Sequence, residues 1–430
     1  MLAVVGSGLS GAAAARLLQL HGVEHVLVER GPNLGVRHVG SDERTAHLEN
    51  PREDPSFRAF DIGASSPYAP TAGYRSRVGG RGLYWRGICL RIEPEALASW
   101  PDGPREALLS EHYGAAEETL ARWVGRPLAA ARSATEQRLV QTLSAAGYSA
   151  TATPRAVRFS DGGWSAYSPI AELSAARIRP DRQVTSVVRR PGRGFVLRGP
   201  AHELVVDGVI FAAGVFENVR LVAGLTGADQ AAKIVDHVAS GFLVFGPGGE
   251  HDTVDASAYA GFHRSAGSNL FVESGAVDGG TMIDAWAMGE QPPDAASVLS
   301  GGAVALDARA RHRLDDVEAR QRRLLDDAAA RLGFSAPRWA GLDFDAASRR
   351  ARREPGVAIG YRAGIGELDH ESCGLPVGGE LVDDDGRLRA APDAYVVGPC
   401  LFPRAGAANP TLTTLALTHH VIGAVLADQL

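Results

Sequence analysis

The sequence predicts an α/β fold with a mainly parallel sheet, joined to a second, discontinuous α+β domain built on an antiparallel sheet. Residues 2–5, 10–21 and 25–29 follow the pattern of a buried strand, a helix and a second buried strand. Residues 204–211 form a further apolar strand, which runs into small residues at a helix start. Short alternating strands over residues 241–300 favour a separate antiparallel sheet.

Length and composition limit the class of protein. The chain has 430 residues, of which 45% are hydrophobic and 22% charged, as expected for a globular protein of two domains. Its net charge of −6 argues against non-specific binding to nucleic acid. Three cysteines are too few for a disulfide framework, and no run of 18 apolar residues predicts a membrane span. We therefore expect a cytoplasmic protein with no metal site, no membrane contact and no nucleic-acid partner.

The first strand is followed by a G-x-G-x-x-G motif. Gly6 and Gly8 allow a tight turn and a close approach of the backbone to a pyrophosphate, and Gly11 lets the helix and strand pack. Glu29, 18 residues after Gly11, is placed to accept hydrogen bonds from a ribose diol. The motif predicts a Rossmann-type dinucleotide site that NAD or FAD would fit, and a glycine-rich turn without a ligand is the alternative. The predicted contacts here are Gly6, Gly8, Leu9, Ser10, Gly11, Glu29 and Arg30.

A second glycine-rich loop covers residues 78–87. Its glycines stand beside two large aromatic residues, which suggests backbone pressed against a flat ligand, although the aromatic rings could instead seal the core. The predicted contacts are Gly79, Gly80, Tyr84 and Trp85. Helical apolar spacing over residues 108–124 and 136–145 predicts two helices of a cap layer.

Strands are predicted at residues 177–179, 184–189, 194–198 and 204–211. The last strand ends in small residues at a helix start, where the backbone can lie close to a nucleotide, so this segment should rejoin the first domain. The predicted contacts are Val184, Ala213 and Gly214.

The segment over residues 241–300 is acidic, with strands predicted at 241–245, 269–273 and 281–288. Its eight acids outnumber its one basic residue, Arg264, so the local charge is 1 − 8 = −7. Such a field could attract a cationic substrate, or the acids could form a solvated face. The acids are Glu250, Asp252, Asp255, Glu273, Asp278, Asp284, Glu290 and Asp294. A charged amphipathic helix is predicted to follow at residues 307–332.

The C-terminus is predicted to form a strand at residues 394–397, a loop rich in Gly, Pro and Ala, and one final helix. Asn409 and Pro410 mark the helix start, because Asn is a favoured N-cap and Pro suits the first helical position. The free N–H groups and positive dipole end at such a start favour a bound anion.

Five segments together resemble a known family. They are GSGLSG at residues 6–11, VGGRGLYW at 78–85, FAAGVFENVRL at 211–221, Asp236-His237, and VVGPCLFPRAGAANPTLTTLAL at 396–417. With them the chain resembles, over nearly its whole length, the glucose–methanol–choline (GMC) flavoprotein oxidoreductases, and most closely the pyranose oxidase branch. The resemblance implies FAD rather than NAD. It also implies that residues 398–413 close over the isoalloxazine, with contacts at Gly398, Asn409, Pro410 and Thr411 and reduced flavin as the anion.

The resemblance further implies a catalytic pair, His370 and Asn409. A neutral imidazole can take a hydroxyl proton as hydride leaves carbon, and an amide can hold the substrate oxygen. The alternatives are a structural histidine and an asparagine that serves only as a helix cap. This chain has Cys373-Gly374 where the family usually has Gly-Thr. It also has Tyr84 where pyranose oxidases attach flavin through a histidine, so non-covalent FAD is expected, with tyrosyl attachment as the alternative.

The expected function is FAD-dependent oxidation of an alcohol group by hydride transfer to flavin N5, with His370 as general base. The expected substrate is a sugar, an amino sugar or another polyol, such as one used in aminoglycoside-like biosynthesis. A redox-neutral flavoprotein lyase and a relative that has lost catalysis are the alternatives. Residues 1–100, 171–235 and 355–430 are assigned to the FAD-binding domain, and residues 101–170 and 236–354 to the substrate-binding cap domain. The oligomeric state stays open.

Overall fold

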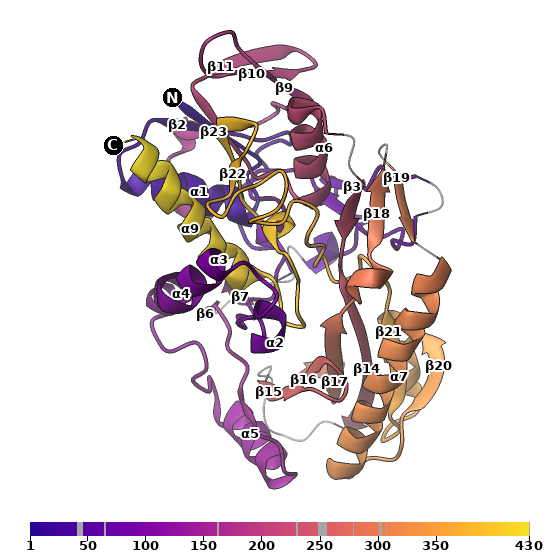
Figure 1. The fold of residues 1–430 in the computed structure, drawn as a ribbon. Helices are drawn as coiled ribbons and strands as arrows, with labels where there is room; N and C mark the ends of the chain where they lie inside the picture. Colours follow the sequence, from indigo (N-terminus) through magenta and orange to yellow (C-terminus); the bar gives the residue numbers. More distant parts are fainter. Residues whose placement is uncertain are drawn as a thin grey trace.

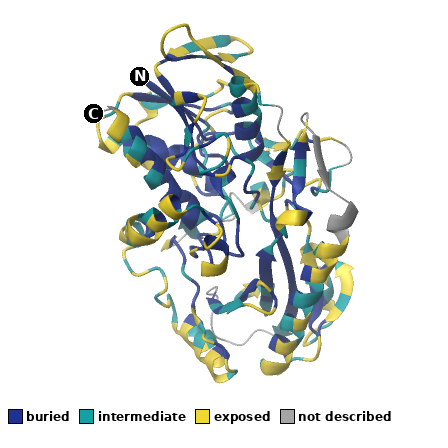
Figure 2. Ribbon diagram, in the orientation of Figure 1, coloured by how far each residue is buried: buried dark blue, intermediate teal, exposed yellow. Residues whose placement is uncertain are grey.

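The computed structural model describes residues 1–40, 46–63, 66–160, 163–228, 231–247, 256–277, 279–300, 303–306 and 308–429. Two large sheets organise this part of the chain (Figure 1). One sheet is mainly parallel and the other is mostly antiparallel, so the predicted fold class is confirmed. In Figure 2 the inner strands of the parallel sheet are coloured as buried, whereas α5 and much of α7 are coloured as exposed or intermediate.

The first sheet has the strand order β22-β23-β12-β1-β2-β8. Its inner strands are parallel, with Leu2 opposite both His25 and Gly208, and only β22 runs antiparallel to its neighbour. Continuous apolar strands of this kind are typical of a parallel sheet buried on both faces. The bounds are β1 Leu2–Val5, β2 His25–Val28, β8 Ile178–Arg179, β12 Gly208–Phe211, β22 Arg387–Leu388 and β23 Ala391–Val396.

Helices α1 (Leu9–Leu20) and α9 (Thr411–Gln429) pack against each other beside this sheet. A run of buried alanines, Ala12 to Ala15, faces the core from α1 and permits the close approach of neighbouring backbone. Both helices begin at the carboxyl end of a strand, where ligands of open α/β sheets bind. Helix α6 (Val215–Thr226) begins in the same way after β12.

The second sheet has the strand order β20-β21-β14-β17-β16-β15-β5. It is antiparallel except for the β20/β21 pair, and it is built on two strands of 11 residues, β14 and β17. The helix α7 (Ala308–Arg331) contacts β14 and β17, as Figure 1 shows. The bounds are β5 Thr151–Ala152, β14 His237–Pro247, β15 Ala256–His263, β16 Ser268–Val277, β17 Gly280–Glu290, β20 Arg338–Leu342 and β21 Ile359–Ala363.

The remaining elements connect or cover the two sheets. The hairpins are β3 Phe57–Ala59 with β4 Gly73–Arg75, and β6 Val157–Ser160 with β7 Gly163–Ala166. Three further strands, β13 Ala232–Ile234, β18 Ser297–Ser300 and β19 Ala303–Leu306, pair with one another. The other helices are α2 Pro94–Leu97, α3 Asp102–Ala107, α4 Tyr113–Val124, α5 Ala134–Ala145 and α8 Phe344–Arg353.

The single strand predicted at residues 204–211 is wrong. The structure divides it into β11 (His202–Val206), which pairs with β10 (Phe195–Gly199), and β12, which joins the parallel sheet. Asp207 separates them, and its backbone N–H donates to Met1 O at 3.0 Å. The Asp-Gly pair at residues 207–208 separates the apolar runs 204–206 and 209–211 and is a turn signal that the prediction of one strand did not use. With β9 (Ser186–Arg189), β10 and β11 form a small antiparallel sheet.

Two contacts between elements cross the predicted domain boundaries. Helix α4, assigned to the cap, contacts α9 and buries Tyr113 and Leu120 in the core of the parallel sheet. Strand β21, assigned to the first domain, pairs with β14 of the second sheet. Periodicity shows which face of an element is apolar, but it does not show which sheet covers that face.

Two further observations concern the chain as a whole. The three cysteines, Cys89, Cys373 and Cys400, are buried free thiols. Among the helices of the described residues, none has the length and apolar character needed to cross a membrane.

Candidate functional site

A cavity of about 1260 Å³ is lined by residues from both sheets. Pockets for a single small ligand usually measure about 300–1000 Å³. The cavity therefore has room for a large ligand together with a smaller one. Its walls come from the carboxyl ends of β1, β2 and β12, from the loop before α9, and from the second sheet.

One end of the cavity is the turn between β1 and α1. Gly6 has a φ of +103°, and a Cβ there would lie 2.4 Å from Ala212 O. A Cβ at Gly11 would lie 1.9 Å from Gly6 O, so this glycine packs the helix against the turn. Gly8 differs because no described atom lies within 4 Å of its ideal Cβ. Gly6, Gly8, Leu9 and Ser10 line the cavity, and Gly11 lies behind them.

Glu29 lies at the end of β2 and lines the same end of the cavity together with Arg30. Its carboxylate accepts hydrogen bonds from Ser7 N–H at 3.0 Å, Ser7 Oγ at 2.7 Å and Gly31 N–H at 2.8 Å. Burial raises the pKa of Glu29, and these three hydrogen bonds oppose that shift. The carboxylate is thus held in one orientation beside the helix start, as an acceptor of ribose hydroxyls would be.

The turn between β12 and α6 forms the neighbouring wall. Val184, Ala213 and Gly214 line the cavity there, and Gly214 has a φ of +92°. Gly398 does not line it. A Cβ at Gly398, where φ is +120°, would lie 3.4 Å from Ser10 Oγ, which places this glycine against α1.

The second glycine-rich loop contributes Gly80, Tyr84 and Trp85 to the wall. Gly79 lies behind it, because its N–H donates to Ser7 Oγ at 2.9 Å and so ties the two glycine turns together. The indole N–H of Trp85 donates to Tyr167 O at 2.8 Å.

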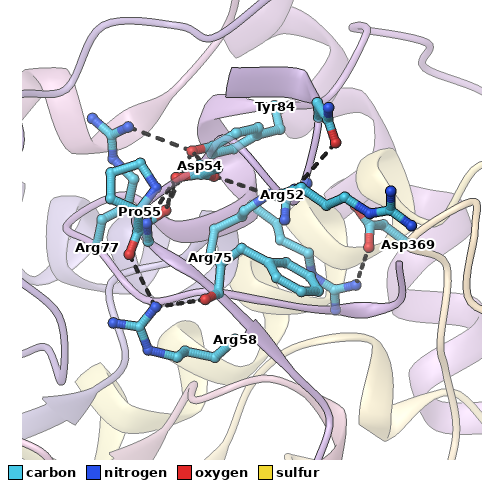
Figure 3. Close-up of polar contacts among 12 residues, drawn as sticks. Arg52, Asp54, Pro55, Arg58, Arg75, Arg77, Tyr84 and Asp369 are labelled. Carbon is cyan, nitrogen blue, oxygen red and sulfur yellow. Dashed lines mark hydrogen bonds and ion pairs between the residues drawn. The ribbon is translucent and has the colours of Figure 1, made fainter. Parts of the chain in front are cut away.

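Tyr84 has several polar neighbours (Figure 3). Its hydroxyl donates to Asp54 Oδ2 at 2.7 Å, and Arg77 donates to the same hydroxyl at 3.4 Å. Arg75 lies 3.4 Å from the Asp54 carboxylate and 4.9 Å from the centre of the tyrosine ring. Burial raises the pKa of Tyr84, so its hydroxyl stays protonated at neutral pH.

The predicted pair, His370 and Asn409, meets on the cavity wall. His370 Nε2 lies 3.4 Å from Asn409 Nδ2. The other ring nitrogen, Nδ1, lies 3.1 Å from His237 Nδ1, and His237 Nε2 lies 3.0 Å from Gly406 O. Asn409 Oδ1 is buried and has no hydrogen-bond partner among the described residues. Pro410 and Thr411, at the start of α9, line the cavity beside Asn409.

The backbone around His370 is tied to the C-terminal loop. Three N–H groups after it, those of Cys373, Leu375 and Val377, donate at 2.8–2.9 Å to carbonyls of residues 399–401. Cys373 has a φ of +70°, which is uncommon outside glycine. Cys373 thus combines an uncommon backbone conformation with a hydrogen bond to the C-terminal loop, three residues after His370.

A charged group lies beneath the histidines. Arg81 binds Glu371 at 2.7 Å and Asp369 at 3.0 Å. Burial lowers the pKa of His370 well below its usual value, and His237 and Arg81 lower it further. Burial lowers the pKa of His237 to about 4. Both imidazoles are therefore neutral at pH 7.

The second sheet contributes two of the acids of segment 241–300 to the cavity, Glu273 and Asp284. They stand directly opposite each other on β16 and β17, and burial together with Glu273 raises the pKa of Asp284 to about 8. Glu290 and Asp294 instead pair with Arg404 and Arg313. Glu250, Asp252, Asp255 and Asp278 lie outside the described residues.

Sequence reasoning assigned no role to His237 or Arg81. The resemblance includes Asp236-His237, but nothing in the local sequence shows that His237 faces a residue 133 positions later. Arg81 belongs to the glycine-rich loop, for which the sequence predicted contacts of glycine backbone and aromatic rings but no role for the arginine side chain. Among the described residues, no group of three or more His, Cys, Asp or Glu side chains could hold a metal ion.

These features define a Rossmann-type dinucleotide-binding protein with a second, antiparallel domain. The family model described as NAD(P)-binding Rossmann-like domain matches residues 4–65. The crystal structure of pyridoxine 4-oxidase from Mesorbium loti is similar over 99% of both chains, with a TM-score of 0.65 and 17% sequence identity. At that identity the similarity establishes the fold. No curated protein matches the sequence.

Proposed function

We propose that the protein is an FAD-dependent oxidoreductase that oxidises the alcohol group of a small polar substrate. One observation carries the proposal: His370 and Asn409 meet on the wall of a cavity that the β1–α1 glycine turn also lines. Hydride transfer to a dinucleotide cofactor requires a base close to the bound cofactor, and this cavity is lined both by a candidate base and by a dinucleotide-binding turn. The full-length similarity to an enzyme named as an oxidase supports the same class.

The residues present fit FAD. The open space at Gly8 leaves room for a pyrophosphate at the start of α1, and the Glu29 carboxylate is oriented for a ribose. The start of α9 at Pro410 and Thr411 offers a second positive dipole end on the cavity wall. These residues would hold the two ends of the cofactor without a covalent bond. When bound, FAD supplies the hydride acceptor.

The side chains provide the acid–base part of the reaction. Neutral His370 can take the hydroxyl proton of a substrate that lies in the cavity, and general bases contribute about 10²–10⁴-fold to rates. The Asn409 amide can orient the substrate oxygen without competing for its proton. Asn409 is buried and His370 is half-buried, so both side chains are partly shielded from bulk solvent.

Anaerobic mixing tests the proposal. The purified protein should carry FAD, and that FAD should bleach when one member of a panel of sugars, amino sugars and simple alcohols is added. Acid precipitation should then release the flavin into the supernatant. A flavin that remains oxidised while an alcohol substrate is consumed would instead indicate a lyase. A flavin that no substrate of the panel reduces or turns over would indicate a relative without this activity.

For the substrate, we propose an alcohol that also carries an amine. Glu273 and Asp284 line the cavity on adjacent strands, and an ammonium group placed beside them would favour the ionised form of both carboxyl groups. Because screening weakens such attraction, kcat/KM for an aminated alcohol should fall steeply as salt increases. The double variant Glu273→Gln, Asp284→Asn should lower that kcat/KM by about tenfold and flatten its salt response.

A matched control comes from the same segment. Asp294 pairs with Arg313 and does not line the cavity, so Asp294→Asn should leave the salt response unchanged. A wild-type kcat/KM that is flat with salt, or equal for the aminated alcohol and its hydroxyl analogue, would refute the cationic substrate.

A further inference from the structure

His237 contacts the Nδ1 edge of the His370 ring, whereas Asn409 contacts its Nε2. The two rings are nearly perpendicular, at 86°, with centres 4.9 Å apart. His237 is buried and His370 is half-buried, and His237 is held at the start of β14 by backbone pairing with Glu290. This contact places one imidazole where it can control the protonation of the other.

We propose that His237 is a positioning residue that fixes the tautomer of His370, so that Nδ1 of His370 carries the proton and Nε2 keeps a free lone pair. The inference rests on the proposed function, because a free lone pair at Nε2 is what a general base requires. It assigns to His237 a role that differs from direct contact with substrate.

The hydrogen bonds determine the tautomer step by step. The Gly406 carbonyl can only accept, so His237 Nε2, at 3.0 Å, must carry a proton. A neutral imidazole has one N–H, which leaves His237 Nδ1 as an acceptor. The nitrogen that faces it at 3.1 Å, His370 Nδ1, must therefore donate. His370 Nε2 is then unprotonated.

The contact between Asn409 and His370 is consistent with this tautomer. Asn409 presents its amide nitrogen to His370 Nε2 at 3.4 Å, which is the orientation that an unprotonated Nε2 requires. The long distance leaves this contact weak enough for a substrate hydroxyl to replace it. Asn409 Oδ1 points away from this contact and is buried, without a hydrogen-bond partner in the described part of the chain.

The opposite tautomer is unfavourable in this setting. A proton on His370 Nε2 would set two lone pairs against each other between the Nδ1 atoms. Moving the His237 proton to Nδ1 would relieve that contact but would set a lone pair of His237 against Gly406 O. Either arrangement loses a buried hydrogen bond.

The surrounding charges favour the neutral pair. Arg81 is the cation that disfavours protonation of His370. The nearby carboxylates have other partners: Glu371 and Asp369 bind Arg81, and Asp236 accepts from His237 N–H and Gly366 N–H. The protonation of each ring nitrogen is therefore set by the hydrogen bond that the other nitrogen of the same ring makes.

Nitrogen-15 NMR of histidine-labelled wild-type protein tests the tautomer directly. The His370 signals, assigned by their loss in His370→Ala, should show Nδ1 protonated and Nε2 unprotonated at pH 7. Protonation at Nε2 would overturn the inference. This measurement needs no substrate, so it can succeed even if no alcohol bleaches the flavin and the proposed function fails.

Two variants test the consequence. His237→Phe keeps a ring but removes the acceptor, and it should slow anaerobic flavin reduction by about 10²-fold, within the range of general base catalysis, with KM little changed. His237→Asn restores an acceptor oxygen near the place of Nδ1 and should recover most of the rate. The Nδ1–H signal of His370 should be lost in the Phe variant and return in the Asn variant.

The matched control is a second histidine pair outside the cavity. His112 Nε2 lies 3.3 Å from His420 Nδ1, so His112→Phe removes a similar contact and should leave the reduction rate unchanged. Equal losses in His237→Phe and His237→Asn, with the His370 tautomer unaltered in both, would show that His237 serves packing alone. FAD content of each variant confirms that the binding site is intact.

Discussion

Replacement of His370 by alanine should leave FAD bound and slow its anaerobic reduction by substrate by about 10³-fold, as expected when a general base is lost. We expect this loss of rate because His370 is an ionisable side chain that faces Asn409 on the cavity wall. Stopped-flow absorbance at the flavin band measures the rate, and the ratio of flavin to protein absorbance measures occupancy.

The pH dependence of the wild type gives a second readout of the same base. A base acts in its neutral form, and burial, His237 and Arg81 lower the pKa of His370. The acid limb of kcat/KM should therefore fall well below pH 6.5 rather than near it. Flavin reduction at the wild-type rate in His370→Ala would remove this residue from the mechanism.

Replacement of Gly8 by alanine should weaken FAD binding by about 10²-fold, or about 2.7 kcal/mol, while the apoprotein stays as stable as the wild type. Gly8 has an extended backbone at φ −60°, which alanine adopts, and its Cβ would project into open space beside the start of α1. That space is where the proposed pyrophosphate lies. Fluorescence titration of the apoprotein with FAD measures the affinity.

Two other glycines provide the comparison. Gly11→Ala should destabilise the fold by about 3 kcal/mol, because its Cβ would lie 1.9 Å from Gly6 O in a packed core. Gly114→Ala, on the exposed surface of α4, should alter neither FAD affinity nor the apoprotein beyond a small gain in helix stability. Wild-type FAD affinity in Gly8→Ala would contradict the cofactor assignment at this turn.

The sequence by itself determined those elements that depend on residues close together in the chain. The βαβ turn, the acid at the end of β2 and the start of α9 follow from glycine, carboxylate and Asn-Pro chemistry within a few residues. The alternating strands of residues 241–300 likewise predicted the antiparallel sheet. The fold class could be predicted for this reason, and it is confirmed.

The tertiary structure alone decided the contacts between distant segments. Examples are the pairing of His237 with His370, the salt bridges of Arg81, and the packing of α4 on α9 instead of the second sheet. The hydrogen bond from Asp207 N–H to Met1 O belongs with them, because it joins the residues just before β12 and β1, which are 206 positions apart in the chain. The local conformation of the backbone depends mainly on neighbouring residues. The partner of a buried side chain depends instead on strand register and on how whole elements pack.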